Sequence, residues 1–158
     1  MKEESSLNQL IWEKKVTLHI KKMKSPEEIL NLKNVKSTSI RIVVLQHLLS
    51  QEKAVSLKDI ENELTYTDRS SIFRTLKTFE KNKVIHSIED GSGMMKYAVC
   101  SENCNCDPED LHFHFYCSNC SKTFCLLDLP IPDIQLPENF ILQQANFVIK
   151  GLCNNCNK

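Results

Sequence analysis

No stretch of the sequence approaches the roughly 18 uninterrupted apolar residues that a membrane-spanning helix needs. The segment from Met1 to Met23 carries charges throughout and has no small-residue cleavage site, so it is not a signal peptide. Internal repeats are also absent from the sequence. These absences exclude a helical membrane protein and lead us to expect a cytoplasmic protein that binds no membrane.

The chain has no net charge, but its charges are unevenly distributed. Residues 1–88 carry 16 Lys and Arg against 11 Asp and Glu, a balance of +5, whereas residues 89–158 carry 4 against 9, a balance of −5. A basic half joined to an acidic half suggests that the first half meets a polyanion. An ordinary solvated basic face would give the same balance, so the charge alone does not identify the partner.

Cysteine is missing from the first 99 residues, and all eight cysteines lie between Cys100 and Cys156. In a chain without a secretion signal, paired C-x-x-C spacing indicates metal binding rather than disulfides. The pairs are Cys117 with Cys120 and Cys153 with Cys156. Because four thiolates complete a tetrahedral shell with no open position, we predict a structural zinc site whose binding energy supports folding.

The first half has the element order of a winged helix-turn-helix. Helices are expected over residues 25–32, from 38 or 39 onward, over 56–64, and from 68 or 70 to 81. Each begins at a Ser, Thr or Asp cap, and an acidic residue three positions later strengthens the first and third starts. Strands over 84–89 and 95–99 flank the turn Asp90-Gly91-Ser92-Gly93. The last helix takes the place of a recognition helix.

The second half predicts a small sheet, so the fold class is α+β. Strands are expected over residues 111–116, 123–126 and 140–150. Three prolines, Pro130, Pro132 and Pro137, argue against a long helix between the last two strands.

Four segments resemble the ferric uptake regulator (Fur) superfamily of bacterial metalloregulators over residues 34–158. They are Lys36-Ser-Thr38-Ser-Ile-Arg41, Val55-Ser56-Leu57-Lys58-Asp59-Ile60, Ser71-Ile72-Phe73-Arg74-Thr75-Leu76, and His112-Phe-His114-Phe-Tyr-Cys117-x-x-Cys120 with Gly151-x-Cys153-x-x-Cys156. The last of these segments, with its two C-x-x-C pairs, is the most specific to the family. The resemblance implies a homodimeric, metal-dependent repressor that binds palindromic operators in double-stranded DNA and controls metal-uptake genes.

The resemblance also implies a domain organisation and a set of DNA-binding residues. The expected parts are an N-terminal helical extension at 1–33, a winged-helix DNA-binding domain at 34–99, a linker at 100–110 and a small C-terminal α/β dimerisation domain with the zinc site at 111–158. The DNA-binding residues are Lys36, Thr38, Arg41, Arg69, Ser71, Phe73, Arg74 and Lys77. Phe73 replaces the family's usual tyrosine. This replacement keeps the aromatic ring that contacts thymine methyl groups but loses the hydroxyl.

A second, regulatory metal site is expected around His112 and His114, which lie two apart on a strand and therefore share a face. Iron-type members of the family place ligands where this chain has Ala54, Ala98 and Ala145. The remaining candidates resemble the zinc uptake regulator (Zur) type. They are His86, Cys100, His112 and His114, three nitrogens and one sulfur that favour Zn(II).

Other ligands and other functions stay open at this point. Cys104 or Cys106 could replace Cys100, the regulatory site could be lost, and Cys125 reads as a small buried apolar side chain. An iron or peroxide sensor with a degenerate site is one alternative, and a zinc-ribbon protein-interaction module is another that would explain only residues 111–158. No H-x-E triplet accompanies the histidines, so a zinc enzyme with a small-molecule substrate is not expected.

Overall fold

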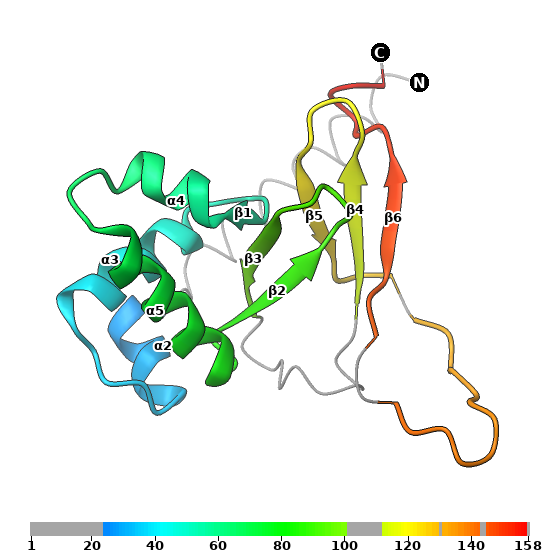
Figure 1. Ribbon diagram of the computed structural model, residues 1–158, viewed down its shortest axis with the longest axis horizontal. Helices are drawn as coiled ribbons and strands as arrows, with labels where there is room; N and C mark the ends of the chain where they lie inside the picture. Colours follow the sequence, from blue (N-terminus) through cyan, green and yellow to red (C-terminus); the bar gives the residue numbers. More distant parts are fainter. Residues whose placement is uncertain (1–23, 101–111, 130, 143–144, 158) are drawn as a thin grey trace, which may run out of the picture.

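The computed structural model describes residues 24–100, 112–129, 131–142 and 145–157. A helical layer, with a small three-stranded sheet at its edge, lies beside a second three-stranded sheet formed by the C-terminal residues (Figure 1). This is the expected α+β architecture. Residues 1–23 of the predicted N-terminal extension lie outside the described residues. Residues 101–110 of the predicted linker, including Cys104 and Cys106, also lie outside them.

Among the described residues four helices form the helical layer, and their starts follow the predicted caps. They are α2 (Pro26–Leu32), α3 (Ser39–Leu49), α4 (Leu57–Glu63) and α5 (Arg69–Lys81). Ser25 and Ser56 each complete a capping box, with Glu28 and Asp59 as the acidic partners. Asp68 accepts a hydrogen bond from the backbone N–H of Ser71 and caps α5, so this helix begins one residue later, at Arg69.

The wing contains the two predicted strands, β2 (Ile85–Glu89) and β3 (Met95–Val99), and one strand that the sequence did not suggest. The additional strand, β1 (Val55–Ser56), pairs with β3 and gives the order β1-β3-β2. The turn between β2 and β3 contains Gly91 and Gly93, both with φ near +80° (79° and 81°), a conformation that glycine adopts without strain. The predicted hairpin is therefore confirmed.

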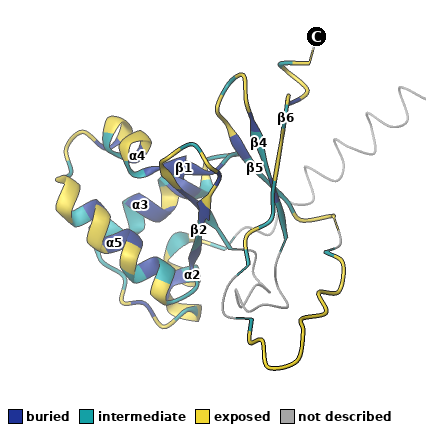
Figure 2. Cartoon of the chain, turned by 45° about the vertical axis from the view of Figure 1, so that its right-hand side comes forward, coloured by how far each residue is buried: buried dark blue, intermediate teal, exposed yellow. Residues whose placement is uncertain are grey.

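The hydrophobic core lies between the helices and the wing. Leu45 of α3 and Ile72, Leu76 and Phe79 of α5 are fully buried in it, and Figure 2 shows the buried inner faces of these helices. Leu30 of α2 belongs to the same core. Because α5 buries one face here, its opposite face is presented to solvent.

The C-terminal sheet has the order β5-β4-β6. Its strands are β4 (Phe113–Cys117), β5 (Thr123–Leu126) and β6 (Val148–Gly151). The strand predicted over 140–150 was too long: Phe140 and Ile141 are exposed and unpaired, and the described part forms strand only from Val148. The described residues between β5 and β6 contain no helix, as the prolines predicted.

The two sheets meet along a short junction. The backbone N–H of Ala54, next to β1, donates to the carbonyl oxygen of Thr123 on β5 at 2.8 Å. The Asn146 side chain donates to the carbonyl oxygen of Glu89 at the end of β2 at 2.7 Å. Both hydrogen bonds fasten the wing to the C-terminal part of the chain. Over the described residues, no helix is long and apolar enough to span a membrane.

Candidate metal centres

The first cluster consists of the four cysteines of the two C-x-x-C pairs. Cys117 ends β4 and Cys153 follows β6, and the parallel pairing of these strands, with Cys117 opposite Gly151, brings the two pairs together. The four sulfur atoms lie within 4.8 Å of one another, and all described cysteines are free thiols. The sulfurs of Cys120 and Cys153 are 3.8 Å apart, which equals the edge of about 3.8 Å expected for a tetrahedron of thiolates around zinc.

The backbone around Cys117 favours the thiolate that a metal needs. The backbone N–H groups of Cys120 and Cys153 point at its sulfur and lower the pKa of the Cys117 thiol to about 6. The Cys153 N–H lies 3.3 Å from that sulfur. Because N–H donors stabilise a negative sulfur, the site is prepared for a cation before one binds. The donor set fits zinc, and the residues are those that the sequence predicted.

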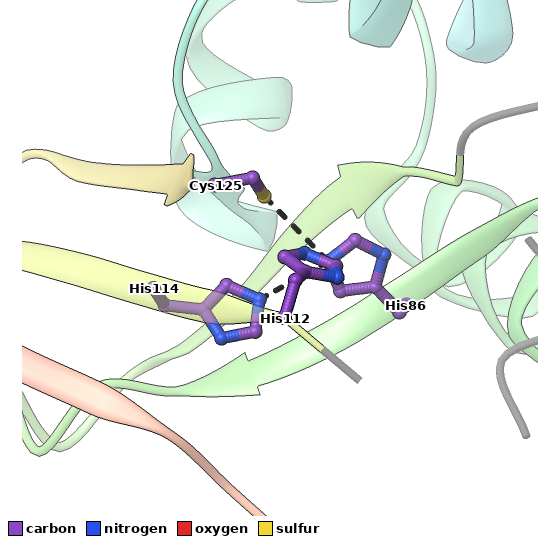
Figure 3. Close-up of side chains that lie close together, drawn as sticks. All are labelled: His86, His112, His114 and Cys125. Carbon is purple, nitrogen blue, oxygen red and sulfur yellow. Dashed lines mark hydrogen bonds between the residues drawn. The ribbon is translucent and has the colours of Figure 1, made fainter. Parts of the chain in front are cut away.

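The second cluster joins the wing to the C-terminal sheet. His86 comes from β2, His112 precedes β4, His114 lies within β4, and Cys125 lies on β5 directly opposite His114. Their ligand atoms lie within 4.8 Å of one another. Figure 3 shows the three imidazoles facing one another, with the Cys125 sulfur pointing toward His86. The Nε2 atoms of His86 and His114 are 3.3 Å apart.

Two of the three imidazoles are held in the form that binds a metal, whereas the thiol must lose its proton to do so. Burial, together with the neighbouring histidines, lowers the pKa of His86 to about 3 and that of His114 to about 4. Both imidazoles are therefore neutral at physiological pH and offer a lone pair. Burial raises the pKa of the Cys125 thiol to about 11, so in the absence of a cation this sulfur keeps its proton.

The structure brings three of the four predicted regulatory ligands together and places Cys125, not Cys100, beside them. The Cys100 sulfur lies 3.6 Å from Nδ1 of His86, on the other edge of the ring from Nε2. Cys125 is half-buried and its sulfur faces His86, so a role as a small apolar side chain does not account for it. The C-x-x-C motif alone did not fix its position, because the hairpin closes between Cys117 and Lys122, and only that register places residue 125 opposite residue 114.

A third group of predicted residues lies on the exposed face of α5 and near the start of α3. Phe73, Arg74 and Lys77 are exposed, and the ammonium group of Lys77 lies 5.9 Å from the centre of the Phe73 ring. Arg69 is also exposed and forms an ion pair with Glu61. Ser71 is half-buried and accepts a hydrogen bond from Arg74.

The other predicted DNA-binding residues lie just before α3 and in its first turn. Lys36 is exposed, and its carbonyl oxygen accepts a hydrogen bond from the Arg41 guanidinium at 2.8 Å. Thr38 is the N-cap residue of α3 and is half-buried. Tyr66 is 75% exposed and lines a groove with residues of α3 and the start of α5.

Comparison with known proteins identifies the family. The family model described as the ferric uptake regulator family matches residues 32–157. The chain belongs to the ferric uptake regulator family. Its members are transcription regulators that bind metal and DNA, and they are not enzymes. The resemblance read from the sequence is thus confirmed.

One curated relative and two solved structures illustrate the similarity. The ferric uptake regulation protein of Campylobacter jejuni is 25% identical over 145 residues, covering 83% of this chain and 85% of the relative. A zinc uptake regulator solved with zinc and DNA has a TM-score of 0.59 at 19% identity and covers 82% of this chain and 89% of that one. The Fur protein of Helicobacter pylori, described with three functional metal-binding sites, has a TM-score of 0.56 at 18% identity over 85% of this chain and 95% of that one.

Proposed function

We propose that this Fur-family protein is a zinc-responsive repressor that binds operator DNA as a homodimer and controls metal-uptake genes. The observation that carries the proposal is the cluster of His86 from the wing with His112 and His114 from the C-terminal sheet. A metal bound there is held by both parts of the molecule. We place the protein in the cytoplasm, where a regulator of this kind meets chromosomal DNA.

A shared metal would act by selecting one arrangement of the two parts. The winged helix carries the DNA-facing helix α5, and His86 lies on β2, which packs against that helix. An ion held by His86 and by the β4 histidines limits how the winged helix is oriented relative to the C-terminal sheet. In a dimer this orientation sets the spacing of the two recognition helices, so the metal shifts the population toward the DNA-competent state.

The chemistry of the donors supports zinc as the sensed ion. The cluster offers imidazole nitrogens and a thiol, and no carboxylate belongs to it among the described residues. Nitrogen and sulfur ligands suit Zn(II), whereas Mn(II) and non-haem Fe(II) sites usually include oxygen ligands. The four-cysteine cluster would hold a second zinc ion with a purely structural role, because its shell leaves no open position.

The surface of α5 supports DNA as the partner. Phe73, Arg74 and Lys77 lie exposed on one side of this helix, where they can enter the major groove together. The positive balance of residues 1–88 adds attraction for phosphates. We assign Arg74 and Phe73 to base contacts, and the remaining predicted residues to the DNA backbone and to the placement of α3 and α5. Those residues are Lys36, Thr38, Arg41, Arg69, Ser71 and Lys77.

The C-terminal sheet supports dimerisation. Its edge strand β6 pairs only with β4 among the described residues, which leaves its outer backbone groups available to a second chain. Large apolar side chains in this part are exposed. They are Leu127, Leu129, Ile134, Leu136, Phe140, Ile141, Ile149 and Leu152. Exposed apolar surface of this extent marks a protein contact, and a second copy of the chain covers it in our proposal.

The test is operator binding as a function of free metal. After the operator has been selected from random duplexes, fluorescence anisotropy is measured while free zinc is raised at fixed ionic strength, with the structural zinc already bound. We expect binding to tighten by about 5–150-fold with zinc, as a coupling of about 1–3 kcal/mol implies. Mn(II) and Fe(II) serve as matched comparisons. Binding that responds to iron instead would identify an iron sensor, and no binding with or without metal would leave a zinc-ribbon interaction module.

A further inference from the structure

We infer that Cys125 is the thiolate ligand of the regulatory site and that Cys100 is a positioning residue that acts on the metal through His86. This inference rests on the proposed regulatory metal and names its ligand set. It differs from the reading of the sequence, in which Cys100 supplied the sulfur.

The distances around His86 fit a tetrahedral shell that includes Cys125. With nitrogens at about 2.05 Å and sulfur at about 2.3 Å from zinc, two nitrogens lie about 3.35 Å apart and a nitrogen and a sulfur about 3.55 Å apart. The His86 and His114 Nε2 atoms are 3.3 Å apart, and the Cys125 sulfur is 3.7 Å from the same His86 nitrogen. An ion placed among these atoms needs little rearrangement of the ligands.

The backbone fixes this arrangement from two sides. Cys125 lies directly opposite His114 in the antiparallel pair of β4 and β5, and Figure 3 shows both side chains turned to the same side as His86. The turn that sets this register is the one that carries Cys117 and Cys120. The structural zinc site therefore holds Cys125 in place for the second site.

Cys100 lies on the wrong edge of the imidazole to share that ion. Its sulfur is 3.6 Å from Nδ1 of His86, whereas His114 and Cys125 approach Nε2. The two ring nitrogens point in divergent directions, so a ligand beside Nδ1 does not reach an ion bound at Nε2. The backbone N–H of Cys100 donates to the Val84 carbonyl oxygen at 3.0 Å, which keeps the residue next to β2.

This position gives Cys100 a defined task. When Nε2 binds the metal, Nδ1 carries the proton and donates it in a hydrogen bond to the Cys100 sulfur. Such partners of metal-binding histidines fix the tautomer and the ring orientation, and their removal lowers metal affinity by about 10–100-fold. Cys100 thus sets the affinity of the site without touching the ion.

The test uses Co(II) as the probe in the full chain with the four-cysteine site filled by zinc. A thiolate bound to cobalt gives an intense near-ultraviolet charge-transfer band, which a sulfur outside the shell does not give. We expect Cys125→Ser to lose this band and Cys100→Ser to keep it at wild-type intensity. Retention of the structural zinc and an unchanged melting temperature show that each variant is folded.

A pair of substitutions at Cys100 separates positioning from simple packing. Cys100→Ser keeps a hydrogen-bond acceptor beside Nδ1, and Cys100→Val removes it at similar volume. We expect cobalt affinity to fall by about 10–100-fold for the valine variant and clearly less for the serine variant. Equal affinities for the two would overturn the positioning role.

The opposite pattern of bands would overturn the ligand assignment: a band lost in Cys100→Ser and kept in Cys125→Ser makes Cys100 the ligand. The spectra are recorded without DNA, so they separate the two proposals. A chain with the expected bands and no metal-dependent operator binding would reject the proposed function and leave this ligand set standing. A chain that binds no cobalt in addition to its structural zinc would reject both.

Discussion

The hydroxyl of Thr123 on β5 donates a hydrogen bond to Oδ2 of Asp90 in the turn of the wing, and both residues are buried. The other carboxylate oxygen of Asp90 accepts from the backbone N–H of Ser92 at 2.8 Å. The carbonyl oxygen of the same threonine accepts from Ala54. One residue of the C-terminal sheet therefore contacts the wing at two points, and it lies two positions before Cys125 on the same face of β5.

Removing this hydroxyl should loosen the junction. Thr123→Val keeps the shape of the side chain but leaves a buried carboxylate with one fewer donor, which costs about 1–3 kcal/mol. We expect the free energy of unfolding to fall by that amount in urea titrations of the metal-loaded protein. Thr78→Val is the matched control, since its hydroxyl donates only to the Arg74 carbonyl oxygen within α5, and its effect should stay within about 0.5 kcal/mol. Equal losses for the two variants would contradict the role of the junction.

The buried histidines should make the protein without regulatory metal sensitive to acid. The pKa values of His86 and His114 lie at about 3 and 4 in the folded chain, below the ordinary value of 6.5. Between the folded and the unfolded pKa, the unfolded chain binds protons that the folded chain does not. The contribution of the neutral histidines to the free energy of unfolding is therefore complete above pH 6.5 and is lost as the pH falls toward 4.

Comparing the wild type with His86→Gln isolates this effect from other titrations. As the pH falls from about 7 to 5.5, we expect the wild type to lose stability relative to the variant by up to about 1 kcal/mol per pH unit. Urea unfolding at several pH values measures the difference. A constant difference over this range would show that His86 binds a proton as readily in the folded chain as in the unfolded one.

The four-cysteine site should be required for the C-terminal sheet. Few apolar side chains are buried in this part of the described chain, where the buried residues are Cys117, Cys153, His114 and Thr123. Metal binding by the four cysteines would therefore replace much of a hydrophobic core, and Cys117→Ser should unfold this sheet or produce a monomer. Zinc content, thermal melting and sedimentation measure the outcome. Unchanged melting with full zinc content would contradict the prediction.

Two substitutions on the DNA-facing surface should have different signatures. Arg74→Ala removes an assigned base contact, so its affinity for the operator should fall by about 1–3 kcal/mol while binding to random duplex changes less. Lys36→Ala removes an assigned phosphate contact, so the affinity should fall for all DNA sequences. The slope of log affinity against log salt concentration should become shallower by about one. Anisotropy titrations at several salt concentrations distinguish the two. An Arg74 variant that weakens both duplexes equally would place that arginine on the backbone.

Local sequence patterns were sufficient for the helices, the wing and the four-cysteine site. Capping boxes at Ser25 and Ser56 depend on residues three apart, and these were confirmed at the predicted positions. The two C-x-x-C pairs are similarly local, and their meeting follows from the few ways in which two such pairs share one ion. Interactions within a few residues are readable from the chain itself.

The parts that were missed depend on contacts between distant segments. The two residues of β1 form a strand because β3 lies beside them, and nothing in Val55 and Ser56 alone indicates it. Our proposal of Cys125 in place of Cys100 likewise depends on which edge of the His86 ring each sulfur reaches, which the sequence alone does not show. The length of the last strand was overestimated because Phe140 and Ile141 are apolar but have no neighbouring strand among the described residues.

The parallel pairing of β4 with β6 has a consequence for synthesis of the protein on the ribosome. Cys117 and Cys120 emerge first, and the pair that completes their metal shell follows only after a further 32 residues. Until then β4 has no partner on the side where β6 will lie, and the four-cysteine cluster at the end of the β4–β5 hairpin is only half complete. The nascent chain can therefore finish its winged helix early, but it completes the four-cysteine cluster and the β4–β6 pairing only after residues 148–156 have been translated.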